Sequence, residues 1–256
     1  MIISRNFIPS LFTVLNAFCG FLSIISSSNG DFTGACYFII YATLFDAVDG
    51  LAARLTNSSS RFGVELDSLS DVVSFGIAPS FLAYKIYLFE LDEIGVILSS
   101  LIMVFAALRL ARFNIQLVGF DKDKFNGLPA PMSALTLISY ILFYHNEIFS
   151  GKTSRIVLIA LSVLLPVLML SKIKYVSLPK PTLSNIKKYP IIFTIIVIAA
   201  ILIIATKGEG IFSFCLFYIF SGILKSFIGL FKGKNMRQKE IDEDEVDDHL
   251  SLKRSD

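Results

Sequence analysis

The sequence predicts an all-α integral membrane protein. Hydrophobic residues make up 54% of the 256 positions and charged residues only 17%. The apolar residues gather in near-continuous runs of about membrane-spanning length, whereas a soluble helical domain would show polar faces between its helices. The net charge of +2 is too small to indicate a nucleic-acid partner. A multi-pass helical protein of the lipid bilayer is therefore expected.

Eight apolar runs are long enough to cross a bilayer, and each is expected to be one helix to within a few residues. They lie at about 8–27, 32–55, 62–89, 94–117, 130–148, 154–171, 190–206 and 211–231. The first six form an expected catalytic core, 1–171. A basic, proline-containing linker (172–189) separates it from two additional spans (190–231). Residues 232–256 are polar and rich in both charges, which is typical of a disordered tail.

The charges in the connections between these runs predict which side of the membrane each terminus faces. The connections 26–31, 90–93 and 207–210 hold one lysine among them, whereas the others are rich in Lys and Arg, most of all 172–189. The positive-inside rule then places both termini in the cytoplasm. The same rule places the stretch from Asp46 to Asp71 at the cytoplasmic face of the inner membrane, where a soluble nucleotide and a lipid can meet.

Four carboxylates interrupt the second and third runs, at Asp46, Asp49, Asp67 and Asp71. A carboxylate at the centre of a membrane helix costs about 2.5–3.5 kcal/mol, and four close together repel one another. Such a cluster is typical of a cation site. The alternative is that these side chains only join helices through hydrogen bonds.

The spacing of these residues places them on two helical faces. Asp46, Asp49, Gly50 and Ala53 share one face of the second helix, and Gly63, Asp67 and Asp71 share one face of the third. Two such helices facing each other would bring the carboxylates together. All-oxygen ligation suits Mg²⁺ or Mn²⁺ rather than zinc. Gly50 and Ala53 leave the first face bare enough for a flat ligand group.

The pattern D-x2-D-G-x2-A-R-x8-G-x3-D-x3-D resembles the signature of the CDP-alcohol phosphotransferases. Every fixed position of that signature is matched, at Asp46, Asp49, Gly50, Ala53, Arg54, Gly63, Asp67 and Asp71. The resemblance implies transfer of a phosphatidyl or similar group from a CDP-linked donor to an alcohol, with release of CMP. It also implies a homodimer, which the family commonly forms.

The resemblance assigns roles to the matched residues. The four aspartates would bind two divalent ions, Mg²⁺ or Mn²⁺, and Asp71 would also act as the general base. Gly50, Ala53, Arg54 and Gly63 would bind the donor, CDP-diacylglycerol. Ser60 matches a donor-contacting position of the family, although 56–60 also resembles a simple polar turn. Arg54 is placed to pair with a phosphate oxygen, and its alternative role is that of a membrane-surface anchor.

The first span has its own polar pattern, formed by Pro9, Thr13, Asn16 and Gly20. Asn16 in hydrocarbon needs a hydrogen-bond partner. It would either contact the nucleotide of the donor or bond a neighbouring helix, and the sequence leaves both open.

Three further stretches narrow the choice of acceptor alcohol. LNAFCGF (15–21), RLARFN (109–114) and FNGLPAP (125–131) resemble motifs of the membrane-embedded phosphatidylserine synthases of bacteria, and the resemblance covers about residues 5–180. It implies L-serine as acceptor. Arg109 and Arg112 would supply a cation for the serine carboxylate, or would anchor the helix end to lipid phosphates. Gly127, Pro129 and Pro131 are expected to shape a helix start.

Three other functions stay open at this point. Phosphatidylglycerophosphate synthase, or another member of the same family, would use a similar site with a different alcohol, and the arginines do not separate serine from phosphate-bearing acceptors. A cation transporter would also use membrane carboxylates. Transporters, however, place such groups near the midplane on broken helices, whereas these cluster towards one face. A lipid-binding scaffold without activity is the third alternative.

Overall fold

A computed structural model describes residues 7–55, 60–118, 127–145, 148–173, 175 and 205–227 of the chain, and its regular elements are all helical. One of the elements, η1, is a π-helix, and another, η2, is a short 3₁₀ turn. The elements follow one another as α1, α2, α3, η1, α4, η2, α5, α6 and α7. Their bounds are Phe7–Ser28 (α1), Phe32–Leu55 (α2), Arg61–Asp71 (α3), Val72–Ile77 (η1), Ala78–Ile86 (α4), Leu88–Leu91 (η2), Asp92–Val118 (α5), Ala130–Phe143 (α6) and Gly151–Leu170 (α7). A final helix, Gly210–Phe227, is called the C-terminal helix below.

Five helices in the described part of the chain are long and apolar enough to cross a membrane. They are Ser10–Ser28, Phe32–Ala52, Leu88–Ile115, Gly151–Leu170 and Gly210–Phe227. The apolar helix α6 is shorter, and α3, η1 and α4 join into one rod from Arg61 to Ile86. The all-α membrane class is thus confirmed. Most of the expected span at 190–206, most of the linker 172–189 and the whole tail 232–256 lie outside the described residues.

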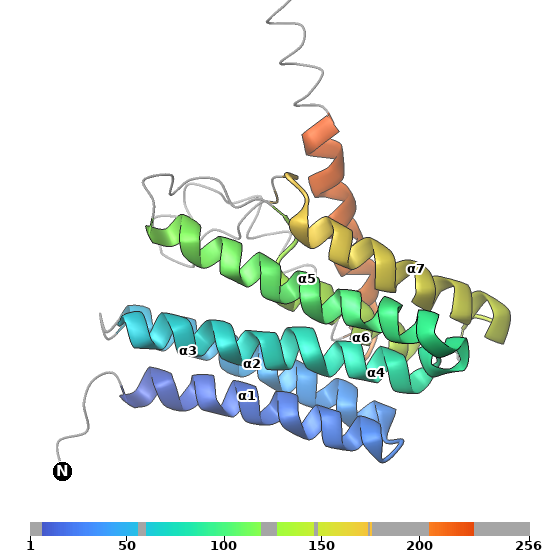
Figure 1. The fold of residues 1–256 in the computed structure, drawn as a ribbon, viewed down its shortest axis with the longest axis horizontal. Coiled ribbons are helices and arrows are strands. Elements are labelled where there is room, and N and C mark those ends of the chain that lie inside the picture. The colour runs from blue at the N-terminus through green and yellow to red at the C-terminus, as the bar shows by residue number, and fades with distance from the viewer. Residues whose placement is uncertain are drawn as a thin grey trace, which may run out of the picture.

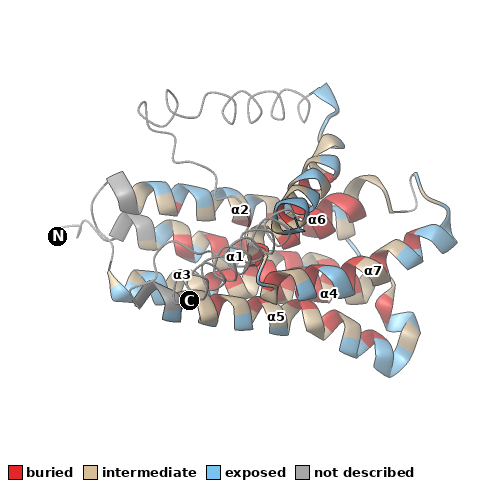
Figure 2. Cartoon of the chain, turned by 90° about the horizontal axis from the view of Figure 1, so that it is seen from above, coloured by how far each residue is buried: buried red, intermediate tan, exposed pale blue. Residues whose placement is uncertain are grey.

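The helices form a bundle in which most axes run roughly side by side (Figure 1). α1 packs most extensively along α2 and also contacts the rod of α3, η1 and α4. α5 lies against α7 on one side and against η1 and α4 on the other, and α6 packs on α2. Buried residues face the interior of this bundle, and exposed ones face outwards (Figure 2). Many of the outward residues are large and apolar, such as Phe18, Leu44, Ile97 and Leu164, as expected beside lipid.

Close helix contacts are made where side chains are small. A Cβ added to Gly20 of α1 would come within 2.8 Å of the Cα of Ser74 in η1. Two residues further along η1, Gly76 faces Ala106 of α5, whose Cβ would lie 3.3 Å from an added Cβ. Small residues of this kind let the backbones of membrane helices approach one another. The rod is therefore held close to α1 and to α5 directly after its last aspartate.

The six residues of η1 form a π-helix that begins right after Asp71. Pro79 follows at the start of α4 and has no N–H to donate to the carbonyl four residues earlier. Widening the helix here relieves the clash of the proline ring with that turn. π-helical turns of this kind often occur beside functional sites.

The start of α6 is fixed by residues that the sequence indicated. Pro129 precedes the helix and Pro131 lies in its first turn. Gly127 has a φ of +92°, and its N–H donates to the carbonyl of Ile173 at 2.9 Å. A side chain at Gly127 would collide with the carbonyl of Met169, so this glycine lets the connection lie directly on the end of α7.

The C-terminal helix crosses the bundle at a steep angle to α5 and α7, and is drawn in orange in Figure 1. Its first turns pack against α6, where the Phe212 ring lies 4.9 Å from the Tyr144 ring. Phe212, Cys215 and Ile219 are buried, whereas Phe217, Phe220, Leu224 and Phe227 are exposed. The helix therefore has one face on the bundle and one apolar face outside it.

Candidate active site

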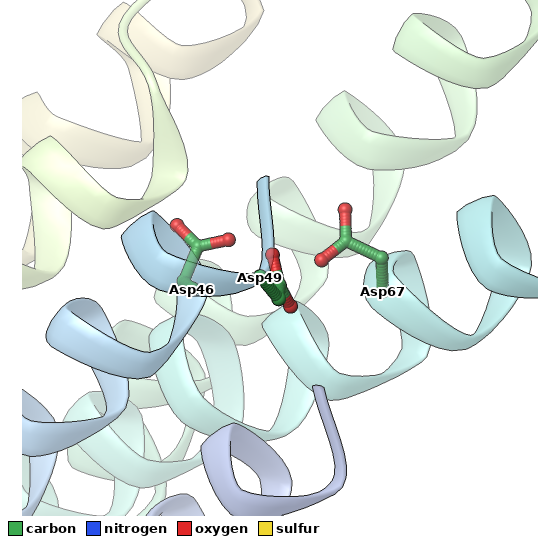
Figure 3. Close-up of side chains that lie close together, drawn as sticks. All are labelled: Asp46, Asp49 and Asp67. Atoms are coloured by element: carbon green, nitrogen blue, oxygen red, sulfur yellow. The ribbon is translucent and has the colours of Figure 1, made fainter. Parts of the chain in front are cut away.

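Three aspartates from two helices meet at one place. Asp46 and Asp49, three residues apart on α2, face Asp67 of α3 (Figure 3). Each aspartate has one carboxylate oxygen that lies within 4.8 Å of a carboxylate oxygen of each of the other two. The expectation that α2 and α3 bring their carboxylates together is thus confirmed for these three residues.

The donor set fits a hard divalent cation. It consists of carboxylate oxygens only, which Mg²⁺ and Mn²⁺ prefer. The Oδ1 atom of Asp67 is buried and has no hydrogen-bond partner within the described protein. A buried carboxylate oxygen without a partner is costly, and a cation between the two helices would remove that cost. The residues present therefore suit a metal centre.

Asp71 lies beside this triad, one turn after Asp67 on the same face of α3. Its side chain is 7% exposed, and it interacts electrostatically with both Asp46 and Asp67. Its Oδ1 atom accepts a hydrogen bond of 3.1 Å from Nδ2 of Asn16. Asp71 is thus oriented by a neutral donor at the edge of the cluster.

α1 supplies the polar groups that hold two of these carboxylates. The hydroxyl of Thr13 donates to Oδ2 of Asp49 at 2.9 Å. Asn16, fully buried one turn later, donates to Asp71 and accepts on its main-chain carbonyl a 2.8 Å bond from the hydroxyl of Ser74. Of the two roles left open for Asn16, the bond to a neighbouring helix is present, and contact with a nucleotide stays a prediction.

The residues expected around the donor lie on the same two helices. Ser60 caps the start of α3, where its hydroxyl accepts a 3.0 Å bond from the N–H of Gly63. Gly50 continues α2 directly after Asp49, and Ala53 and Arg54 follow in its last turn, where their side chains lie outside the described part. The structure thus gives Ser60 and Gly63 a capping role, and the donor contacts of all five residues stay predictions.

The two arginines of α5 reach different surroundings. The guanidinium of Arg112 donates to the carbonyl of Leu170 at 3.3 Å, at the end of α7. Arg109 instead interacts electrostatically with Asp71, and its Nε atom is buried without a hydrogen-bond partner. Of the two, Arg109 is therefore the arginine whose charge acts on the aspartate cluster.

Several polar groups at the site were not singled out by sequence reasoning. The side chains of Ser68 and Asn114 bond each other at 2.9 Å and join α3 to α5 beside Asp67. Tyr218, beyond the sixth expected span, interacts electrostatically with Arg109, and its ring stacks on that of Tyr175. Polar residues in apolar runs are a general signal for such groups, but a lone tyrosine in an apolar run is too common to point to a site.

Comparisons with known proteins agree with this geometry. Residues 6–170 match the family model of the CDP-alcohol phosphatidyltransferases. A CDP-diacylglycerol–serine O-phosphatidyltransferase of Helicobacter pylori is 36% identical over 218 residues, which cover 85% of this chain and 90% of the relative. The enzyme of the same name from Bacillus subtilis is 36% identical over 182 residues, covering 71% of this chain and 97% of the relative.

An archaeal relative extends the comparison. The archaetidylserine synthase of Methanothermobacter thermautotrophicus is 41% identical over 170 residues, which cover 66% of this chain and 69% of the relative. The matched family region contains the complete aspartate pattern from Asp46 to Asp71.

Proposed function

The chain belongs to the CDP-alcohol phosphatidyltransferase family, and we propose that it transfers the phosphatidyl group of CDP-diacylglycerol to L-serine, giving phosphatidylserine and CMP. The observation that carries this proposal is the meeting of Asp46, Asp49 and Asp67 between two apolar helices. The names of the relatives support serine, since the bacterial and archaeal proteins share it as the alcohol.

The reaction needs a proton acceptor beside the metal-binding carboxylates. The serine hydroxyl oxygen attacks the phosphorus that carries diacylglycerol, and a new P–O bond forms. The bond from this phosphorus to the bridging oxygen breaks, and its electron pair leaves with CMP. The hydroxyl proton passes to the carboxylate of Asp71, which Asn16 holds in position. A carboxylate is a weak base, so correct positioning contributes much of the rate.

The aspartate cluster would hold the divalent ions that the family requires. Asp46, Asp49 and Asp67 are the ligands best placed, and Asp71 completes the set of four. We infer two ions, either Mg²⁺ or Mn²⁺. When bound, such ions offset the repulsion between these carboxylates and the donor pyrophosphate, and stabilise the negative charge on departing CMP.

The remaining signature residues are assigned to the donor. Gly50 and Ala53 give α2 a flat face for the cytidine nucleotide, and Arg54 pairs with a phosphate oxygen. Three further residues bind the donor: Gly63 and Ser60 at the start of α3, and Asn16 of α1. Arg109 takes the serine carboxylate, because it is the arginine that interacts electrostatically with Asp71. Arg112 lies one turn further along α5, donates to the carbonyl of Leu170 at the end of α7, and supports Arg109.

The orientation of the protein in the membrane is inferred from the distribution of charge along the chain, and its homodimeric assembly from the family. We infer that both termini and the active site face the cytoplasm, because the chain is basic around the connections that follow α2, α5 and α7. The protein acts as a homodimer, like other members of the family.

An acceptor assay tests the proposed function. Purified protein in detergent micelles is given CDP-diacylglycerol, Mn²⁺ or Mg²⁺, and either L-serine or glycerol 3-phosphate, and CMP and lipid products are measured. We expect CMP and phosphatidylserine with serine and no matching release with glycerol 3-phosphate. CMP release with glycerol 3-phosphate alone would show a phosphatidylglycerophosphate synthase instead.

A further inference from the structure

Two contacts join α5 to the rod of α3, η1 and α4, which runs beside it in the opposite direction (Figure 1). At the first contact, a Cβ added to Gly76 would lie 3.3 Å from the Cβ of Ala106. At the second, Nδ2 of Asn114 donates to the hydroxyl oxygen of Ser68 at 2.9 Å. We call this hydrogen bond the α3–α5 link. The two helices are thus held by backbone proximity at one contact and by two side chains at the other.

The expected base and the arginine of the acceptor site lie between these two contacts. The contacts are eight residues apart on the rod and eight residues apart on α5, which is about 12 Å along a helix. Asp71 lies within the first interval and Arg109 within the second, and their charges interact. The separation of these two side chains is therefore set at both ends of the interval.

The α3–α5 link joins two parts of the bundle that are anchored separately. α3 is held on α1, because Nδ2 of Asn16 donates to Oδ1 of Asp71 at 3.1 Å. α5 is held on α7, because the guanidinium of Arg112 donates to the carbonyl of Leu170 at 3.3 Å. Breaking the link leaves both anchors in place and releases only the separation of α3 from α5 at this end.

The energetics of the α3–α5 link favour a role in positioning over a role in stability. Both side chains are half-buried, and the Ser68 hydroxyl also reaches the carbonyl of Val64 on its own helix at 3.1 Å. Hydrogen bonds between membrane helices add little to stability on average. A displacement of about 1 Å at an active site, however, can lower a rate about a hundredfold.

We propose that Ser68 and Asn114 are positioning residues, which hold Arg109 at the distance from Asp71 that the acceptor serine spans. This inference rests on the proposed transfer to serine. The carboxylate and the hydroxyl of serine are only a few bonds apart, so the groups that receive them must keep a short, fixed separation. Arg109 and Asn114 are the first and last residues of the stretch RLARFN, and the proposal gives its last residue a role.

The test removes each half of the α3–α5 link. Ser68→Ala, Asn114→Ala and the double variant are compared with the wild type for kcat and KM with L-serine, for the KM for CDP-diacylglycerol and for the Mn²⁺ concentration at half-maximal activity. Ser68→Thr keeps the hydroxyl. Ser100→Ala is the matched control, because the Ser100 hydroxyl bonds the carbonyl of Ile97 within α5 itself. Thermal unfolding in detergent gives the melting temperature of each protein.

We expect kcat/KM with serine to fall about tenfold to a hundredfold in Ser68→Ala and in Asn114→Ala. The double variant loses no more than the weaker single variant, because either change breaks the same bond. The Mn²⁺ requirement, the KM for CDP-diacylglycerol and the melting temperature stay near wild-type values, because α3 keeps its bond to α1. Ser68→Thr retains most of the activity, and Ser100→Ala changes none of these quantities.

Three results would overturn the inference. The first is an unchanged kcat/KM with serine in both single variants, and the second is a pair of losses that multiply in the double variant, as for side chains that act independently. The third is a matching rise in the Mn²⁺ requirement or a lower melting temperature, which would show that the pair only supports α3 or the fold. Ser68→Ala decides alone if Asn114→Ala does not fold. A wild type that releases no CMP with serine would instead reject the proposed function itself.

Discussion

At the scale of single residues, the unusual feature is the density of carboxylates in an apolar surrounding. Asp49 and Asp71 are each 7% exposed, and each is held by one neutral donor from α1, Thr13 or Asn16. A single hydrogen bond of this kind orients a carboxylate but does not neutralise it. The charge must be balanced by something that the protein binds, which is why the cluster is interpreted as a metal centre and not as helix packing.

The variant Asp71→Asn separates the role of Asp71 in proton transfer from any role in binding CDP-diacylglycerol. The amide keeps the size of the side chain and can still bond Asn16, but it cannot accept the proton of the serine hydroxyl. We expect turnover to fall by about two to four orders of magnitude, with CDP-diacylglycerol binding largely kept. CMP release and donor binding on the same purified sample measure the two effects. Turnover at the wild-type rate would remove Asp71 from the role of base.

Thr13→Val tests whether α1 tunes the metal centre. Valine has nearly the shape of threonine but cannot donate to Asp49. We expect the Mn²⁺ concentration for half-maximal activity to rise about three- to tenfold, because Asp49 loses its orienting bond. Thr43→Val is the matched control, because the Thr43 hydroxyl bonds only the main chain of α2 at Ile39. The idea fails if both variants need the same Mn²⁺ concentration as the wild type.

At the scale of helices, the site depends on how closely α1 and the rod of α3, η1 and α4 approach. Gly20 of α1 lies directly on Ser74 of η1, and Ser74 bonds the carbonyl of Asn16. The same contact therefore sets the position of Asn16, and through it that of Asp71. The π-helix begins directly after Asp71 and includes Ser74, so it is the part of the rod that meets α1 at this contact.

Gly20→Ala tests this contact. The added methyl group cannot be accommodated without moving Ser74, since the clash is with its main chain. We expect the free energy of unfolding to fall by about 1–3 kcal/mol and activity to fall with it. Thermal unfolding in detergent checks the stability. Gly151→Ala, at a position where an added Cβ meets open space, serves as control and is expected to be neutral. Equal stability of the two variants would contradict the account.

Much of this arrangement could be predicted from the sequence, because membrane helices give long apolar runs and the aspartates share helical faces. The runs at 8–27 and 32–55 match α1 and α2 closely. The π-helix could not be predicted, since Pro79 indicates a disturbance without fixing its form. The partner of Asn16 was also open, because helical periodicity gives the face of a residue and not the neighbour that it meets.

The interaction of Tyr218 with Arg109 was beyond sequence reasoning for a related reason. Tyr218 belongs to the C-terminal helix, which crosses the bundle at a steep angle to α5 (Figure 1). Nothing in the local pattern encodes that crossing angle. The two spans after residue 171 were expected to support a dimer or to line a lipid entry path, and nothing in the sequence indicated that a residue of the last one would interact with Arg109.

At the scale of the whole molecule, the account requires the metal cluster to face the cytoplasm. The described cysteines, Cys19, Cys36 and Cys215, are all buried, which suits labelling with a thiol reagent that cannot cross membranes. We expect Asn29→Cys, on the exposed turn between α1 and α2, to be labelled in sealed right-side-out membrane vesicles. Arg61→Cys, at the exposed start of α3, should be labelled only after these vesicles are opened. The reverse pattern would place the site outside.

The central claim is that α2 and α3 bind divalent ions between their aspartates, and the most direct measurement is Mn²⁺ binding followed by electron paramagnetic resonance. Mn²⁺ is titrated into purified wild type, Asp67→Asn, and Glu65→Gln, which removes an exposed carboxylate from the same helix. We predict that the wild type and Glu65→Gln quench the signal of the free ion alike, whereas Asp67→Asn binds at least about tenfold more weakly. Equal Mn²⁺ binding by all three proteins would contradict the account.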